Sequence, residues 1–308
     1  MEVSQSSKVI DKKPSGPLHV GKPKWLKTKI PTGQTYFDIK KDLRGRKLAT
    51  VCEEAKCPNI GECWNTRTAT FMVMGDTCTR ACRFCNVKTG NPGGWLDAEE
   101  PTQVAGSCLK MGLKYVVITM VDRDDIGDGG ASHVRKVVDE VKKQNPEIVV
   151  ELLAGDFKGQ FSAVEHILDS GLEVYAHNLE TVEALSPRVR DRRADYRQSL
   201  GVLEHAKSYR PGILTKSALM LGLGESEDQV IQTLKDLRSI DCDMITIGQY
   251  MRPSKKHLSI KEWIRPEVFA RYERVARELG FRGVVSAPLV RSSYKASEFY
   301  ENVKGINA

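Results

Sequence analysis

The sequence has no long hydrophobic run and no recognisable secretory signal. No apolar stretch approaches the roughly 18 residues that a membrane-spanning helix needs. Residues 1–21 lack both a continuous apolar region and a small-residue cleavage site. They also lack arginine and contain Glu2 and Asp11, which disfavours, without excluding, a cleaved organelle peptide. We therefore expect a soluble protein of the cytoplasm, or of an organelle matrix in a eukaryotic source, with its cysteines reduced.

Aromatic residues are scarce and the charge is modest, and both limit the classes of partner. Aromatic side chains make up 7% of the 308 residues, and 47 basic against 40 acidic side chains leave a net charge of +7. That balance favours an acidic partner only slightly. Because no nucleic-acid-binding motif accompanies it, we expect neither nucleic acid nor a membrane as partner. The length suits one large α/β domain with extensions.

Short apolar runs alternate with amphipathic helical patterns from residue 67 onward. Six runs are rich in β-branched residues and short enough for buried strands: Ala69–Met74, Tyr115–Val121, Ile148–Leu153, Glu173–Ala176, Ile213–Met220 and Met244–Ile247. Such alternation predicts parallel strands joined by right-handed crossovers. The predicted fold class is α/β, a partial (βα)6 TIM-like barrel, with an open doubly wound sheet as the alternative.

The flanks of the predicted barrel are less regular. Charges, prolines and glycines interrupt residues 23–66, which we expect to form an irregular N-terminal extension with at most one short helix. We further expect a flexible segment over residues 1–22 and the barrel over residues 67–282. The C-terminal segment, residues 283–308, is expected to close over the barrel mouth. Polar residues follow most of the six runs, which predicts a site at the carboxyl ends of the strands.

Six of the eight cysteines form two closely spaced triplets. They are Cys52, Cys57 and Cys63, then Cys78, Cys82 and Cys85. Disulfides require an oxidising compartment, for which the sequence gives no signal. Structural zinc requires four ligands, and no histidine lies between the first and last of these cysteines. Iron–sulfur clusters fit best, because three thiolates hold three irons of a [4Fe–4S] cube and leave the fourth iron open. The remaining Cys108 and Cys242 are predicted to be small buried hydrophobic residues.

The second triplet has a distinctive spacing. Its sequence, Cys78-Thr-Arg-Ala-Cys82-Arg-Phe-Cys85, resembles the CxxxCxxC signature of radical S-adenosylmethionine (SAM) enzymes. The resemblance implies that the open iron binds the amino and carboxylate groups of SAM and that Phe84 lies near its adenine. It also implies reductive cleavage of SAM to a 5′-deoxyadenosyl radical, which abstracts hydrogen from unactivated C–H bonds.

Within that superfamily the chain resembles the lipoyl synthase family, from about Pro23 to Tyr294. The run Cys52-Glu-Glu-Ala-Lys-Cys57-Pro-Asn-Ile-Gly-Glu-Cys63 is similar to the family's auxiliary-cluster motif, and Arg291-Ser-Ser-Tyr294 is similar to its C-terminal motif. The resemblance implies two [4Fe–4S] clusters, the auxiliary one donating sulfur. It further implies that Ser293 ligates the auxiliary cluster and leaves as that cluster loses iron, and that Arg291 positions or gates this region.

The same resemblance implies the reaction and its partners. The substrate is an octanoyl group on a carrier lysine, and sulfur enters at C6 and C8 at the cost of two SAM molecules per lipoyl group. The carriers are 2-oxoacid dehydrogenase E2 subunits and the glycine cleavage H protein. A ferredoxin or flavodoxin supplies electrons, and iron–sulfur repair proteins rebuild the auxiliary cluster.

The resemblance also implies contacts to SAM at six residues. They are Phe84, Asn178, Glu180, Lys216, Gly222 and Glu225. Asn178 and Glu180 alternatively cap a helix, and Gly222 and Glu225 alternatively form a strand-to-helix turn with the carboxylate at the positive end of the helix. His177 is interpreted as a structural histidine. The arginine-rich run at residues 188–193 is a solvated face, or alternatively attracts an acidic carrier domain.

Two other functions stay open from the sequence. One is a different radical SAM enzyme that inserts sulfur into another substrate. The other is an iron–sulfur carrier or a zinc-stabilised binding module. The second class predicts no cleavage of SAM under reducing conditions.

Overall fold

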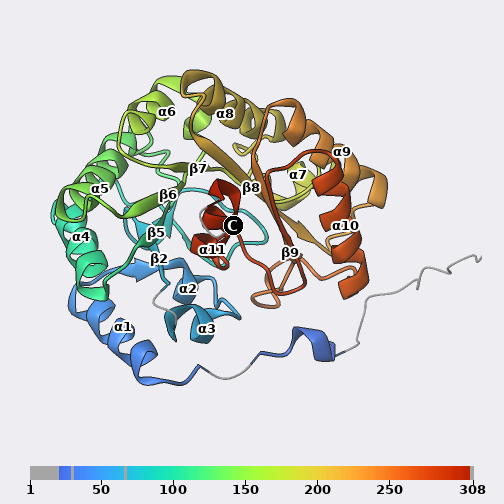
Figure 1. The fold of residues 1–308 in the computed structure, drawn as a ribbon, viewed down its shortest axis with the longest axis horizontal. Coiled ribbons are helices and arrows are strands. Elements are labelled where there is room, and N and C mark those ends of the chain that lie inside the picture. The colour runs from blue at the N-terminus through green and yellow to red at the C-terminus, as the bar shows by residue number, and fades with distance from the viewer. Residues whose placement is uncertain (1–20, 29–30, 66–67, 306–308) are drawn as a thin grey trace, which may run out of the picture.

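An eight-stranded sheet that curls into an open barrel forms the body of the protein. The structure, a computed structural model, describes residues 21–28, 31–65 and 68–305. The sheet order follows the chain, β1-β2-β5-β6-β7-β8-β9-β10. Its strands are β1 (Ala49–Thr50), β2 (Thr70–Val73), β5 (Tyr115–Met120), β6 (Val149–Leu153), β7 (Val174–Ala176), β8 (Leu214–Leu221), β9 (Met244–Gln249) and β10 (Gly283–Ser286). Within the described residues no pairing joins β10 to β1 or β2, so the barrel stays open (Figure 1).

The strands from β2 to β10 are all parallel, as the alternating pattern predicted. Among the described strands only β1 runs antiparallel, against β2. The six predicted runs correspond to β2, β5, β6, β7, β8 and β9, and β10 adds a seventh parallel strand. The predicted partial α/β barrel is confirmed. A separate two-stranded ladder of β3 (Thr77–Cys78) and β4 (Lys88–Thr89) brackets the loop of the second cysteine triplet.

Helices cover the outer face of the sheet (Figure 1). They are α4 (Glu100–Met111), α5 (Ala131–Gln144), α6 (Phe161–Leu168), α8 (Tyr196–Tyr209), α9 (Glu227–Ser239) and α10 (Pro266–Glu278), with short α7 (Ser186–Val189) before α8. In α5, Val134, Val137, Val138 and Val141 share one face and are all fully buried. A capping box between Ser226 and Gln229 starts α9. The amphipathic pattern thus fixes which side of each helix packs on the strands.

The N-terminal extension is more helical than predicted. It contains α1 (Gln34–Gly45), α2 (Val51–Glu54) and α3 (Ile60–Asn65), so the expectation of at most one short helix is wrong. The only buried apolar residues of α1 are Ile39 and Leu43. The sequence of this helix is mostly charged and polar, so its hydrophobic periodicity is too weak to predict a helix. Polar contacts to α4 compensate, since Asp42 accepts hydrogen bonds from Ser107 at 2.7 Å and Lys110 at 2.6 Å. Such tertiary contacts are invisible to a search for periodicity.

The C-terminal segment does two things, of which the sequence predicted one. Residues 291–294 lie at the carboxyl ends of the strands, where the cavity described below opens. Helix α11 (Ala296–Lys304) instead packs at the opposite, amino-terminal end of the barrel, where Phe299 and Tyr300 contact Tyr115 and Leu214. It appears inside the ring of strands in Figure 1. Helix α11 therefore forms the barrel floor, a role that the predicted tail over the mouth did not include.

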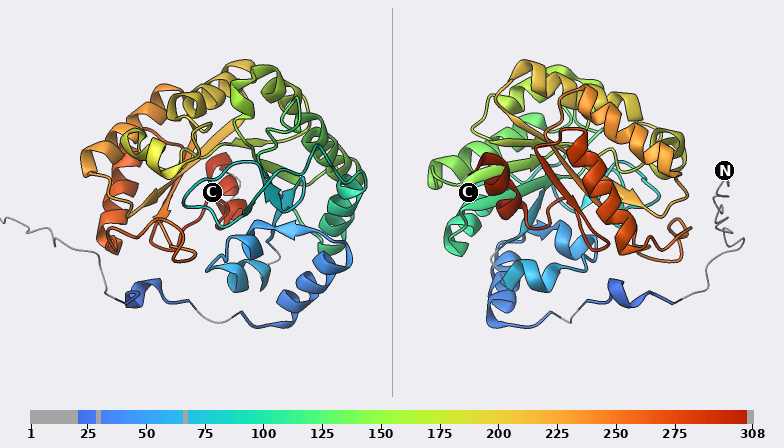
Figure 2. Two further views of the ribbon diagram at one scale, coloured as in Figure 1. Left: turned by 180° about the vertical axis from the view of Figure 1, so that it is seen from behind. Right: turned by 45° about the vertical axis from the view of Figure 1, so that its right-hand side comes forward.

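The predicted domain boundaries stay predictions. The flexible segment predicted over residues 1–22 lies outside the described residues except for Gly21 and Lys22. In the left view of Figure 2 the N-terminal extension runs along the bottom of the barrel, whereas α11, next to the end marked C, lies within the ring. Across the described part of the chain, no helix has the length and apolar character to cross a membrane.

Candidate functional site

All six clustered cysteines line a single cavity of about 630 Å³ at the carboxyl ends of the strands. Cys52 lies on α2, Cys63 on α3 and Cys57 between them, whereas Cys78 ends β3 and Cys82 and Cys85 follow on the next loop. None of the eight cysteines forms a disulfide. Arg291, Ser292, Ser293 and Tyr294 complete the lining. The structure therefore brings together the three motifs that the sequence singled out.

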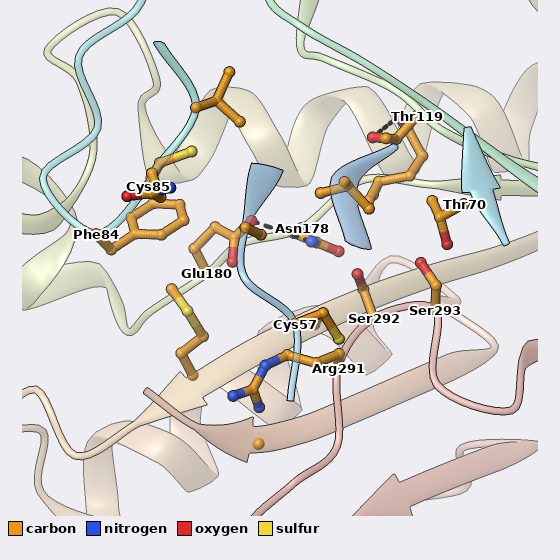
Figure 3. A pocket seen from close by; sticks show the side chains of 18 of the residues that line it. Cys57, Thr70, Phe84, Cys85, Thr119, Asn178, Glu180, Arg291, Ser292 and Ser293 are labelled. Atoms are coloured by element: carbon orange, nitrogen blue, oxygen red, sulfur yellow. Dashed lines mark hydrogen bonds between the residues drawn. The ribbon is translucent and has the colours of Figure 1, made fainter. Parts of the chain in front are cut away.

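Side-chain hydrogen bonds join the segment of the first triplet to residues 289–294. The Asn59 side chain donates to the Leu289 carbonyl at 2.7 Å, and the Tyr294 hydroxyl donates to Glu62 at 3.2 Å. Asn59 and Glu62 lie between Cys57 and Cys63, so they hold residues 289–294 against the cysteine segment. In Figure 3 the hydroxyls of Ser292 and Ser293 point into the cavity, near Cys57 and Arg291.

The loop of the second triplet is held by donors to its sulfur atoms. The backbone N–H of Arg80 donates to Cys78 Sγ at 3.4 Å, and that of Asp191 donates to Cys82 Sγ at 3.2 Å. Burial nevertheless raises the pKa of Cys78 to about 11 and that of Cys82 to about 12. In the first triplet burial raises the pKa of Cys52 to about 11. These thiols lose their protons when a metal centre compensates for the buried negative charge.

Arg80, within the CxxxCxxC motif, anchors that loop to the barrel. Its guanidinium donates to Asp156 at 2.6 and 2.8 Å and to Asp124 at 3.0 and 3.1 Å. A third carboxylate, Asp122, lies 3.5 Å away and lines the cavity. Burial raises the pKa of Asp122 to about 6, although Arg80 opposes the shift. Sequence reasoning missed Arg80, because its partners follow two different strands.

Three predicted SAM contacts line the cavity. Phe84 precedes Cys85, while Asn178 and Glu180 follow β7. Asn178 donates to Glu180 at 3.1 Å, which orients both side chains. Burial raises the pKa of Glu180. Its backbone also has φ of +67°, a left-handed conformation that is uncommon for a non-glycine residue and accumulates at functional sites. Figure 3 shows Phe84 and Glu180 on the same side of the site as Cys85.

The other three predicted contacts do not line the cavity. Lys216 is 1% exposed and donates to Glu151 at 2.7 and 2.9 Å near the floor of the barrel. We therefore correct its assignment from a cofactor contact to part of a buried ion pair. Glu225 accepts hydrogen bonds from the N–H groups of Gly222 and Leu223, which is the strand-to-helix turn of the alternative interpretation. Gly222 itself has φ of +98°.

His177 and Arg190 form the wall next to Asp156. The ring of His177 bonds the Ala154 carbonyl and the Ser199 hydroxyl, each at 2.9 Å, which agrees with a structural histidine. Burial lowers its pKa to about 4. Arg190 is also buried, donates to Ser199 at 2.8 Å and lines the cavity, so this member of the arginine-rich run is not part of a solvated face.

The donor set fits [4Fe–4S] clusters better than single ions. No three His, Cys, Asp or Glu side chains in the described ranges are grouped as ligands of one metal ion. A cube distributes its thiolates over different irons, so its ligands are spaced more widely than those of one zinc ion. Each triplet offers three thiols on short segments around a shared, partly apolar space, which is the ligand chemistry that such a cube requires.

Comparisons with known proteins match both halves of this site. A family model described as the radical SAM superfamily matches residues 72–237, and one described as the N-terminal domain of lipoyl synthase matches residues 4–57. The mitochondrial lipoyl synthase of Candida albicans is 58% identical over 286 residues, covering 91% of this chain and 74% of that protein. The chain belongs to the lipoyl synthase family. The mitochondrial lipoyl synthase of Aedes aegypti is 57% identical over 283 residues, covering 90% of this chain and 72% of that protein.

Solved structures show a related fold at low identity. Methylornithine synthase is 14% identical with a TM-score of 0.54, covering 82% of this chain and 75% of that one. The [FeFe]-hydrogenase maturase HydG is also 14% identical, with a TM-score of 0.58 and coverage of 87% and 69%. These likenesses concern the fold alone.

Family membership confirms the predicted enzyme class and changes one expectation. The enzyme is a radical SAM enzyme of the lipoyl synthase type, which implies a [4Fe–4S] cluster and SAM. The relatives are named as mitochondrial, which disagrees with the predicted cytoplasm and agrees with the alternative of an organelle matrix.

Proposed function

We propose that the enzyme inserts two sulfur atoms, at C6 and C8, into an octanoyl group carried on a protein lysine. The observation that carries the proposal is the convergence of both cysteine triplets and the segment Arg291–Tyr294 on one cavity. One reaction then has a radical source and a sulfur source within reach of the same acyl chain. At about 630 Å³ the cavity is of the size that encloses small-molecule ligands.

The two triplets would hold two different clusters. Cys78, Cys82 and Cys85 would hold the cluster that binds and reductively cleaves SAM, and Cys52, Cys57 and Cys63 with Ser293 would hold the auxiliary cluster. When bound, the first supplies the radical chemistry and the second supplies sulfur. Ser293 is a suitable ligand for an iron that must be released, because an oxygen ligand is a poorer match for iron–sulfur chemistry than a thiolate.

The chain's own side chains orient SAM and shield it. Phe84 offers an apolar face for the adenine, and Asn178 and Glu180 offer a donor and an acceptor for the polar end or the ribose hydroxyls. Their mutual 3.1 Å hydrogen bond reduces the conformational freedom lost on binding. Arg291 lines the cavity, interacts electrostatically with Cys57, and donates from its Nη1 to the Val290 carbonyl at 2.6 Å. It positions the C-terminal motif and carries a positive charge beside the auxiliary ligands.

The position of the cavity supports a substrate carried on a protein arm, and family membership supports the choice of partners. An extended acyl-lysine arm enters a cavity at the carboxyl ends of the strands while the folded carrier stays outside. We propose octanoylated E2 and H-protein carriers, a ferredoxin or flavodoxin as electron donor, iron–sulfur repair proteins, and the organelle matrix as compartment.

The proposal is tested by anaerobic reconstitution with iron and sulfide, followed by assay on an octanoyl-lysine peptide with SAM and dithionite. We expect about eight irons per chain, as two cubes require, and a peptide mass gain that corresponds to two sulfur atoms. An unreconstituted sample is the control. Iron at the level of one cube, or cleavage of SAM without any gain in peptide mass, would contradict the proposal.

A further inference from the structure

Five exposed basic side chains lie on the loop that carries the second cysteine triplet and on two segments that are hydrogen-bonded to it. They come from that loop, from α7 and the turn after it, and from the segment after β9: Arg83, Arg188, Arg192, Lys255 and Lys256. We call these five residues the basic patch. Cys82 and Cys85 line the cavity, whereas no member of the patch does, including Arg83 between them. The patch therefore lies outside the cavity that receives the substrate.

Hydrogen bonds join the three segments into one surface. Arg83 Nη1 donates to the Arg188 carbonyl at 3.4 Å, and the Arg83 backbone N–H donates to the Val189 carbonyl at 2.9 Å. On the other side, the Leu258 N–H donates to the Arg83 carbonyl at 3.2 Å, and the His257 ring donates to the Cys85 carbonyl at 2.8 Å. The patch is thus attached directly to the backbone of the cysteine loop.

No acidic side chain in the described ranges forms an ion pair with the basic patch. Other exposed arginines are paired, such as Arg197 with Glu183 at 2.6 Å. Asp191 is the only acidic residue in segments 79–90, 186–193 and 251–261. Its carboxylate already accepts hydrogen bonds from the Arg193 side chain and the Ala81 N–H. An acidic partner would supply the missing counter-charges.

We propose that the basic patch is the docking surface of a small acidic electron-transfer protein that reduces the cluster of the second triplet. The inference rests on the proposed function, which needs one electron for each SAM cleaved. The donor protein loses one electron and the cluster gains it, and no atom moves in this step. Opposite charges would steer the encounter and orient the donor.

The position of Arg83 distinguishes an electron donor from the acyl carrier. A protein seated on Arg83 is separated from the cluster by little more than the loop between Cys82 and Cys85, and electron transfer weakens steeply with distance. The acyl carrier must instead present its lysine arm to the cavity, whose lining excludes all five patch residues. The geometry therefore favours the electron donor.

The test uses a fourfold charge reversal and a matched control. The test variant is Arg188→Glu, Arg192→Glu, Lys255→Glu and Lys256→Glu, which leaves the cysteine loop intact. The control variant is Lys114→Glu, Lys136→Glu, Lys235→Glu and Arg274→Glu, which reverses exposed basic residues that form no ion pair and lie elsewhere on the barrel. Both variants change the net charge equally.

Each reconstituted protein is assayed with two reductants and two substrates. The reductants are dithionite and a reduced [2Fe–2S] ferredoxin, and the substrates are an octanoyl-lysine peptide and an octanoylated carrier domain. At low salt we expect the test variant to lose about tenfold or more in kcat/KM for the ferredoxin with either substrate, as steering effects are on that scale. With dithionite as the reductant, both variants should insert sulfur at the same rate as the unmodified enzyme. Calorimetric titration with oxidised ferredoxin, which involves no turnover, should show that the test variant binds the ferredoxin more weakly than the unmodified enzyme does.

The outcomes separate the alternatives. A defect with dithionite that appears only with the carrier domain would assign the patch to the acyl carrier and overturn the proposal. Equal ferredoxin activity and affinity in all three proteins, or a defect under every condition, would also overturn it. A failure of the proposed function is distinguishable, because the unmodified enzyme would then insert no sulfur with dithionite while the ferredoxin titration would still report on docking.

Discussion

The side-chain amide of Asn59 donates a 2.7 Å hydrogen bond to the carbonyl of Leu289, joining residues 230 positions apart in the chain. Asn59 is buried, so the bond is protected from water. It joins the segment that carries the first cysteine triplet to the segment that carries Ser293. Two motifs far apart in sequence are thereby fixed as one group.

Removing that bond should uncouple sulfur insertion from SAM cleavage. We expect Asn59→Ala to lower the free energy of unfolding by about 1–3 kcal/mol, because the Leu289 carbonyl loses its partner. Sulfur insertion per 5′-deoxyadenosine formed should fall as well, since Ser293 is less well positioned. Tyr294→Phe is the comparison: it removes an exposed contact to Glu62 and should have a smaller effect on stability. An unchanged ratio of products in Asn59→Ala would contradict the role assigned to this bond.

The two triplets should differ in their response to substitution. Replacing Cys52, Cys57 or Cys63 with alanine should leave 5′-deoxyadenosine formation intact and abolish sulfur insertion. Replacing Cys78, Cys82 or Cys85 should abolish both. Each class should retain about four irons per chain, as expected for one remaining cube. Cys108→Ala, at a buried site outside the cavity, is the matched control and should retain both activities.

Arg80 should control how firmly the second triplet retains iron. Arg80→Lys keeps the charge but loses the paired hydrogen bonds to Asp156 and Asp124, which a planar guanidinium alone can make. We expect Arg80→Lys to lose iron to a chelator faster than its parent does. Both proteins also carry Cys52→Ala, so that only one cluster is present. Arg197→Lys removes a similar paired contact to Glu183 at an exposed position and should lose iron at the parent rate. Equal rates in the two variants would count against an anchoring role.

The buried pair of Lys216 and Glu151 should stabilise the floor without contributing to catalysis. Glu151→Gln leaves an unpaired buried ammonium group and should cost about 3–5 kcal/mol in urea unfolding. The double variant Glu151→Gln with Lys216→Met removes both charges and should recover much of that loss. Its KM for SAM should equal that of the unmodified enzyme. A raised KM for SAM in the double variant would show that Lys216 does contact the cofactor.

His177 should make stability depend on pH below neutrality. Its pKa falls from 6.5 to about 4 on folding, because burial disfavours the charged ring. Between these values the unfolded chain binds the proton and the folded chain does not, so stability is complete above pH 6.5 and decreases as the pH falls toward 4. The slope reaches about 1.4 kcal/mol per pH unit at most. His177→Gln should flatten this dependence in urea unfolding between pH 7 and pH 5, and parallel curves for the two proteins would refute the assignment.

Much of the site was predictable because its ligands are close in sequence. Cysteine spacing picked out both triplets, and the strand pattern predicted that the second triplet lies at the carboxyl ends of the strands. The missed features depend on tertiary contacts. The anchoring role of Arg80 depends on carboxylates that follow two separate strands. Helix α1 depends on its polar contacts to α4. The assignment of Lys216 to SAM is wrong because Lys216 lies near the amino end of β8, where its ammonium group faces Phe299 and does not line the cavity.

Helix α11 comes after every strand of the sheet along the chain, yet it closes the amino-terminal end of the barrel that those strands form. Until it has been synthesised, the ammonium group of Lys216 lacks the Phe299 ring that covers it at 5.5 Å, and the apolar ends of several strands stay exposed. The barrel therefore cannot be completed from its amino terminus onward during translation. Chains interrupted before α11 should expose this floor to chaperones or proteases, which would remove them before they acquire iron.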